Sequence, residues 1–154
     1  MTMLDSARHI GVVSEPRTVE VEKGFLKLFA KATGEKNPIH FDEEAARRAG
    51  HPGIVAPPTY LFSLHMGAPA KRGDLFDAEG GVGVDMTRIL HASQSMDIVL
   101  PIHGGERVTL TTTTTDIYEK KGGAFQFIVQ ETEGRNADGE LCARMRNVMA
   151  VRNG

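Results

Sequence analysis

The stretch TGEKNPIH, residues 33–40, places a carboxylate and an imidazole five positions apart across a bend. Asn37–Pro38 predicts the bend, because a proline has no N–H and disfavours the helical conformation in the residue before it. Gly34 is a plausible stop for a preceding helix, whose apolar residues follow helical spacing: Phe25, Leu26, Leu28, Phe29 and Ala32. Glu35 and His40 are therefore a candidate acid/base pair aimed into one cleft. On spacing alone, the same residues also fit a surface loop with a half-buried histidine.

Composition indicates an ordinary soluble globular protein. The 154 residues are 40% hydrophobic and 25% charged, with a net charge of −2, and we expect one domain spanning 1–154. There is no basic stripe and no apolar run near the ~20 residues that cross a bilayer, so neither nucleic acid nor membrane is an expected partner. The single cysteine, Cys142, excludes an intrachain disulfide. Without a secretory signal, this predicts a cytoplasmic location.

The local patterns predict an α+β protein. Residues 42–50, DEEAARRAG, predict a short helix with Asp42 as its N-cap, and residues 59–66, TYLFSLHM, are apolar on nearly all sides, which is typical of a buried helix. From Val82 onward the chain predicts strands, beginning with an extended stretch over 82–99 and continuing through hairpins with turns at 120–123 and 136–139. The alternation at the C-terminus puts Cys142 on the face opposite the apolar series. Consecutive hairpins after an early buried helix indicate an antiparallel sheet.

A resemblance to a known family adds to this prediction. Residues 29–46, FAKATGEKNPIHFDEEAA, resemble the hydratase-2 signature of MaoC-like dehydratases and (R)-specific enoyl-CoA hydratases. The departure is Glu35, where that family usually has Asp. Residues 50–64, GHPGIVAPPTYLFSL, and 90–108, LHASQSMDIVLPIHGGERV, resemble the branch with a FAS1-like dehydratase domain. The resemblance implies a single hot-dog fold, in which the antiparallel sheet wraps around the central buried helix.

The resemblance also implies a site and a chemistry. Glu35 and His40 would share acid/base work on a water that adds reversibly to a 2-enoyl thioester, giving a (3R)-hydroxyacyl thioester. The enolate formed on the way needs hydrogen-bond donors at the thioester oxygen. Since Pro57 and Pro58 have no N–H, the donor would be the Thr59 amide or hydroxyl, or the Tyr60 amide.

Other residues are assigned to binding or to structure. Asn37 and His91 complete the expected substrate-binding set, although His91 also fits a residue that satisfies a strand hydrogen bond. We expect His65 to be a hydrogen-bonded core histidine and His51 and His103 to be turn or loop residues. We expect no metal site and no cofactor, because the chain has neither metal-ligand spacing nor a nucleotide-binding loop.

Three functions remain open. The first is hydration and dehydration of an acyl-CoA or acyl-carrier-protein thioester, the second is an acyl-CoA thioesterase on the same fold, and the third is a non-catalytic acyl-binding subunit of a heteromeric dehydratase. Under each of them a sheet edge favours a homodimer, a higher homo-oligomer, or a heterodimer with another hot-dog subunit.

Overall fold

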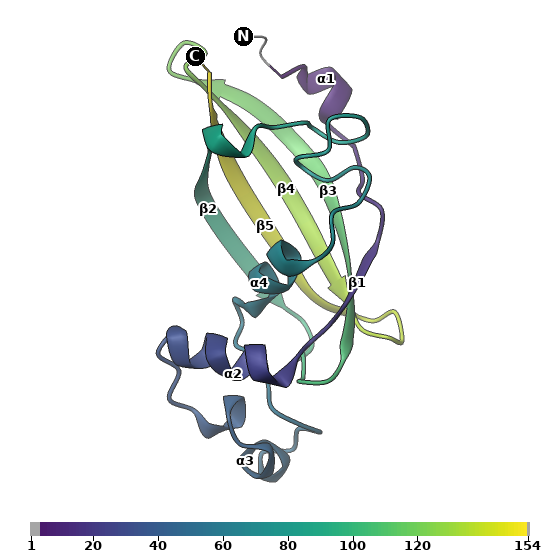
Figure 1. Cartoon of the computed structure of the whole chain (residues 1–154), viewed down its shortest axis with the longest axis vertical. Coiled ribbons are helices and arrows are strands. Elements are labelled where there is room, and N and C mark those ends of the chain that lie inside the picture. The colour runs from purple at the N-terminus through teal and green to yellow at the C-terminus, as the bar shows by residue number, and fades with distance from the viewer. Residues whose placement is uncertain (1–3, 154) are drawn as a thin grey trace.

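A computed structural model describes residues 4–153, so both ends of the predicted domain 1–154 extend beyond the described residues. Five antiparallel strands form one sheet in the order β1-β3-β4-β5-β2. The strands are β1 (Arg17–Glu20), β2 (Ile89–Ile98), β3 (Arg107–Lys120), β4 (Phe125–Arg135) and β5 (Leu141–Arg152). The helices are α1 (Ser6–His9), α2 (Lys23–Ala32), α3 (Glu43–Arg48) and α4 (Tyr60–Gly67), with short 3-10 helices η1 (Pro38–His40) and η2 (Met86–Arg88). Figure 1 shows α4 lying against the sheet, with α2 and α3 beyond one end of the strands. This is the predicted α+β architecture.

The central helix packs closely on the sheet at Gly134. Leu61 and Leu64 of α4 are buried, and a Cβ added at Gly134 would lie only 2.9 Å from Cδ1 of Leu61 and 3.3 Å from Cγ1 of Val108. A glycine at this position of β4 therefore lets the helix approach the sheet. The predicted helix over 59–66 is shifted by one residue, since Thr59 is the N-cap of α4.

The face of β4 that meets α4 is not its most apolar one. Gly134 faces α4, so the residues at even positions share that face; these are Gln126, Ile128, Gln130 and Thr132, and all are buried. Phe125, Phe127 and Val129 share the other face, as alternation predicted, and Phe127 stacks on Tyr118 with ring centroids 5.2 Å apart. Hydrophobicity alone would have chosen the wrong face of this strand for the helix.

A polar row crosses the sheet on the side of α4. The register pairs Thr114 with Gln130, Gln130 with Asn147, and Asn147 with Gln94, which joins β3, β4, β5 and β2. Gln130 Nε2 donates to Thr114 Oγ1 at 3.2 Å, whereas Gln94 Oε1 and Asn147 Oδ1 have no hydrogen-bond partner among the described residues. These side chains are polar, so their residue types do not predict burial. Only their alternating positions along the strands place them on the buried face.

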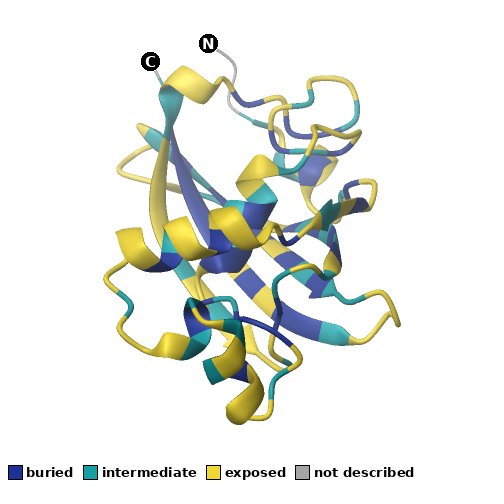
Figure 2. Cartoon of the chain, turned by 60° about the horizontal axis from the view of Figure 1, so that its bottom comes forward, coloured by how far each residue is buried: buried dark blue, intermediate teal, exposed yellow. Residues whose placement is uncertain are grey.

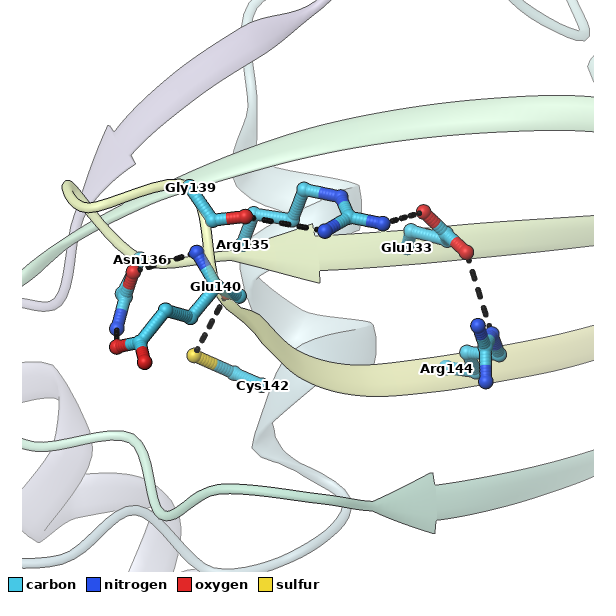
Figure 3. Close-up of polar contacts among 7 residues, drawn as sticks. All are labelled: Glu133, Arg135, Asn136, Gly139, Glu140, Cys142 and Arg144. Atoms are coloured by element: carbon cyan, nitrogen blue, oxygen red, sulfur yellow. Dashed lines mark hydrogen bonds and ion pairs between the residues drawn. The ribbon is translucent and has the colours of Figure 1, made fainter.

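The hairpin between β4 and β5 forms the predicted turn at 136–139 (Figure 3). Asn136 Oδ1 accepts from the N–H groups of Asp138 and Glu140 at 3.0 and 2.9 Å, and Gly139 has the positive φ of 78° that the turn requires. The Cys142 thiol points to Glu140 O at 3.7 Å. Cys142 was predicted on the face opposite the apolar series, but it is buried in the same core cluster as Ala143 and Met145. The N–H groups of Val99 and Leu100 both donate to its carbonyl, which brings that segment against it.

The extended stretch predicted over 82–99 is wrong in its first part. The strand begins only at Ile89, because the Asp85 carboxylate accepts from the N–H and hydroxyl of Thr87 and caps η2. Val82 and Val84 instead pack in a loop with Leu75. Helix α1 was not predicted either, and the segment that follows it pairs with β3 through Val13 and Thr113.

Exposure is uneven across the molecule (Figure 2). The central strands are mostly buried, whereas β2 is an edge strand whose Leu90 is 63% exposed and whose Ile98 is 47% exposed. Helix α2 also presents apolar side chains to solvent, with Phe25 62% and Leu28 61% exposed. Across residues 4–153, no helix combines the length and apolarity needed to span a membrane.

A buried cation lies beneath the C-terminal half of α4. Arg17 of β1 is buried; its Nη2 lies 2.8 Å from His65 Nδ1, and its Nη1 lies 3.5 Å from Asp74 Oδ2. Since a guanidinium only donates, His65 Nδ1 accepts and the ring is neutral. Burial and then the Arg17 charge lower the pKa of His65 from 6.5 to about 4. His65 is thus hydrogen-bonded, as the sequence predicted, although it is half-buried and not a residue of the core.

We expect this histidine to make the protein less stable in mild acid. The unfolded chain takes up the His65 proton at a higher pH than the folded chain, so stability is lost as the pH falls from 6.5 to about 4, by up to about 3 kcal/mol. In His65→Asn, the side-chain oxygen can still accept from Arg17 but does not titrate. Urea unfolding at several pH values should give a flatter dependence for this variant, and equal slopes for both proteins would contradict the assignment.

Candidate functional site

The backbone of Glu35 is held by the end of α2. Gly34 has a positive φ of 77°, the Glu35 N–H donates to Ala30 O at 2.9 Å, and the Gly34 N–H donates to Lys31 O at 3.2 Å. These bonds form a Schellman motif, the common way in which a helix ends at a glycine. Gly34 is therefore the helix stop that the sequence predicted, and it determines where Glu35 leaves the helix.

His40 is held by η1 and by the main chain of Val55. Asn37 caps η1, since its Oδ1 accepts from the Ile39 N–H at 3.2 Å, and Pro38 occupies the first turn. His40 is buried, and its Nδ1 lies 2.6 Å from Val55 O. A carbonyl oxygen can only accept, so Nδ1 carries the proton in this contact. In the neutral ring Nε2 is then left unprotonated.

The two predicted acid/base residues face each other. His40 Nε2 lies 3.7 Å from Glu35 Oε2, with side-chain exposures of 10% and 34%. That separation is longer than a direct hydrogen bond. It is compatible with a water molecule that contacts both groups. The structure thus brings Glu35 and His40 together, with the carboxylate on the more open side.

Of the two backbone amides predicted as donors at the start of α4, one is already hydrogen-bonded within the chain. The Tyr60 N–H donates to Pro57 O at 2.9 Å, so this amide is already used. Within residues 4–153 no acceptor takes the Thr59 N–H, and the Thr59 hydroxyl makes no capping hydrogen bond. Of the predicted oxyanion donors, the Tyr60 amide is already engaged with Pro57 O, whereas the Thr59 amide and hydroxyl have no such contact in the described part of the chain.

Tyr60, Asn37 and His91 have other contacts. Tyr60 is buried and meets Phe29 edge to face at 5.2 Å, and its burial together with the Glu22 carboxylate raises the pKa of Tyr60. The Asn37 side chain serves as the cap of η1. His91 stacks on Phe62 of α4 at 5.0 Å. A β-bulge between His91 and Ser93 turns His91 to the side of the sheet that α4 covers. Among the described contacts, none joins His91 to Glu35 or His40.

A cavity of ≈670 Å³ opens between α2, β1 and α4. Its apolar lining includes Phe25, Leu28, Phe29, Ala32, Tyr60 and Leu64. Neither Glu35 nor His40 lines it. Two of its lining residues are close in sequence to the candidate site residues. Ala32 lies three residues before Glu35, and Tyr60 directly follows Thr59.

Two features of this region were missed from the sequence. The Val55 carbonyl that orients His40 is a main-chain group, for which residue type gives no signal. The cavity did have a signal in the apolar residues of α2. Phe25 and Leu28 belong to the same helical pattern as Leu26 and Phe29, yet they face outward. A helix with an apolar stripe wider than its buried face indicates a second surface to cover.

Relatives and solved structures agree with this architecture. A UPF0336 protein of Streptomyces coelicolor is 36% identical over 111 residues, which cover 71% of each chain. The structure resembles the HadBC (3R-hydroxyacyl-ACP dehydratase) complex of Mycobacterium tuberculosis, with a TM-score of 0.76, 23% identity, and coverage of 92% of this chain and 96% of the other. It also resembles the ChsH1–ChsH2 complex of the same organism, with a TM-score of 0.69, 28% identity, and coverage of 92% and 89%.

These likenesses confirm the hot-dog fold of MaoC-like dehydratases. Residues 8–145, most of the chain, match the family described as FAS1-like, dehydratase domain region. The chain belongs to that family.

Proposed function

We propose that the protein catalyses the reversible hydration of a 2-enoyl thioester to a (3R)-hydroxyacyl thioester. The observation that carries the proposal is the pair of His40 Nε2 and Glu35 Oε2, 3.7 Å apart, with the other ring nitrogen of His40 bound to Val55 O. Two further findings support the reaction class: the chain belongs to a dehydratase-domain family, and its fold resembles that of HadBC, a (3R)-hydroxyacyl-ACP dehydratase.

In the proposed reaction, a water molecule is held between Glu35 and His40. One of the two groups removes a proton from the water as its oxygen attacks Cβ, which leaves an enolate, and that same proton is then delivered to Cα, so the pair ends in its starting protonation state. In the reverse direction they remove the Cα proton and protonate the leaving hydroxyl. An imidazole whose Nε2 is unprotonated and a carboxylate are suited to exchange protons in this way. Glu35 has a longer side chain than the Asp usual in the family. Its backbone is fixed at the end of α2 by the Schellman motif, and from there its carboxylate reaches His40.

The enolate intermediate needs a donor at its oxygen. We assign this role to the Thr59 amide and hydroxyl at the start of α4, which have no partner among the described residues. An unpaired N–H at the first turn of a helix is suited to bind an oxygen that gains negative charge. Asn37 would act by shaping η1, and His91 remains a proposed substrate-binding residue on the opposite side of α4.

The acyl chain would enter the cavity between α2, β1 and α4. Its lining is apolar, and ≈670 Å³ lies within the usual size of small-molecule pockets. Exposed Phe25 and Leu28 at this cavity would gain a covering surface from a bound acyl chain. The carrier, CoA or acyl carrier protein, would remain outside.

We further propose that β2 pairs with a second hot-dog chain. Its outer edge has no strand neighbour within the described chain, and Leu90 and Ile98 are exposed on it. An exposed edge with apolar side chains is a template for association. HadBC and ChsH1–ChsH2 are complexes of two different chains, so the partner can be a second copy or another hot-dog subunit.

Replacing either member of the acid/base pair should abolish most of the activity. We expect Glu35→Gln and His40→Ala each to lower kcat for hydration of crotonyl-CoA by about 100-fold to 10,000-fold. Loss of absorbance at the enoyl-thioester band measures the reaction. Glu119→Gln, which removes an exposed carboxylate near the far end of β3, is the matched control. Release of free CoA thiol without hydration would instead favour a thioesterase.

Filling the cavity should change the preference for chain length. Ser63 of α4 lines the cavity, and Ser63→Leu would occupy the space expected for the distal acyl carbons. We expect kcat/KM for 2-decenoyl-CoA to fall by about 10-fold or more relative to crotonyl-CoA. Ala137→Leu, on the exposed β4–β5 turn, should leave the ratio unchanged. An equal loss for both substrates in Ser63→Leu would argue against this cavity as the acyl site.

Light scattering should give a particle mass of twice the chain mass of 16.7 kDa, because the β2 edge is expected to pair with a second copy. The double variant Leu90→Lys/Ile98→Lys should shift the particle toward the monomer, since charged side chains on an edge strand oppose pairing. A monomeric, inactive wild-type chain that gains activity with a second hot-dog subunit would favour the heteromeric assembly. A dimer that the double variant leaves intact would place the interface elsewhere.

A further inference from the structure

A chain of three polar side chains lies next to the segment that holds His40. His103 is 7% exposed, its Nδ1 lies 2.8 Å from Glu106 Oε1, and its N–H donates to Glu106 Oε2 at 3.1 Å. His51 Nδ1 lies 3.2 Å from His103 Nε2. A carboxylate only accepts, so His103 Nδ1 carries a proton. Both oxygens of Glu106 are thus used to fix one histidine.

Val55 lies between this chain and His40. Its N–H donates to Ile39 O at 2.9 Å, its carbonyl accepts from His40 Nδ1 at 2.6 Å, and it pairs with His103 in an antiparallel bridge. The same short ladder continues on both sides, from Ala56 N–H to Ile102 O at 2.8 Å and from Gly104 N–H to Ile54 O at 2.9 Å. The direction of the Val55 carbonyl therefore depends on the loop that carries His103.

That loop is in turn anchored to the beginning of α2. The Gly105 N–H donates to Val21 O at 2.7 Å, and the Val21 N–H donates to Glu106 O at 2.8 Å. Glu106 therefore connects the main chain before α2 with the His103 ring. A continuous set of contacts leads from the start of α2 to His40, through His103 and Val55.

The direction of the Val55 carbonyl matters for the proton on His40. While the carbonyl accepts from Nδ1, the neutral ring keeps Nε2 free toward Glu35. If the carbonyl turned away, the proton would no longer be favoured on Nδ1, and the ring would also populate the form protonated at Nε2. That form cannot accept a proton on the side of Glu35.

We propose that His103, fixed by Glu106 and His51, is a positioning residue that keeps the Val55 carbonyl on His40 Nδ1 and so selects the tautomer of His40 that is active. The expected effect on catalysis rests on the proposed function. The effect of His103 on the tautomer of His40 does not depend on it. At metal sites, groups that hydrogen-bond the other ring nitrogen of a histidine ligand contribute about 10-fold to 100-fold, and we expect an effect of the same order here.

The tautomer can be read directly by NMR. Long-range ¹⁵N–¹H correlation spectra of the full chain distinguish a protonated from an unprotonated ring nitrogen, and the His40→Ala spectrum identifies the His40 signals. The wild type should show the form protonated at Nδ1. We expect His103→Leu, which removes both polar contacts, to show a mixture of the two neutral forms. In His103→Asn the side-chain amide can still donate to Glu106, and we expect it to restore most of the wild-type form.

Kinetics should follow the tautomer. In His103→Leu we expect kcat for crotonyl-CoA to fall by about 10-fold to 100-fold with KM changed by less than about threefold, and His103→Asn to recover most of the loss. Glu106→Gln replaces the carboxylate with an amide, and it serves as the test if His103→Leu fails to fold. Glu119→Gln is again the matched control.

The proposal is overturned if His40 keeps the proton on Nδ1 in folded His103→Leu or, where that variant does not fold, in folded Glu106→Gln. An altered tautomer with unchanged kcat would overturn its catalytic part. If the wild type hydrates no enoyl thioester, the proposed function fails, and the NMR result still decides whether His103 controls the His40 ring.

Discussion

The contact between Leu61 and Gly134 sets the distance between the central helix and the sheet. A side chain at position 134 would come within 2.9 Å of Leu61 Cδ1, so the approach depends on a glycine near the end of a core strand. Overpacking of a buried position typically forces neighbouring groups to shift. The same contact places α4, whose N-cap is Thr59 and whose Phe62 stacks on His91 of β2. The candidate site and the fold thus share one packing constraint.

Helix α2 supports both members of the candidate acid/base pair, one from each end. Its C-terminal end fixes Glu35 through the bonds to Ala30 and Lys31. The main chain just before it, at Val21, holds the loop of Glu106 and His103, which supports Val55 and hence His40. The same helix lines the apolar cavity through Phe25, Leu28 and Phe29. A rigid element between two functional groups is an economical way to hold them in register.

Much of this arrangement was readable from local sequence, and the remainder depended on contacts distant in the chain. Gly34, Asn37–Pro38 and the Asp42 cap act within a few residues, so their roles followed from the residue types. The Val55 carbonyl has no such signal, and neither does the pairing of Arg17 with His65. Cys142 and the loop over Val82 and Val84 were misplaced because alternation describes one strand and not the segment that packs on it.

The order of the strands has a consequence for the nascent chain. Helix α4 is synthesised before β2–β5, the strands that make up most of its sheet, and β2 has no strand partner until β5 has been made. An eight-residue helix is unstable alone in water, so Leu61 and Leu64 remain uncovered until these strands have been made. Pairings this distant in sequence form slowly, and the exposed apolar segment is a natural substrate for ribosome-associated chaperones. The fold therefore leaves α4 without its full sheet until β5 has been synthesised.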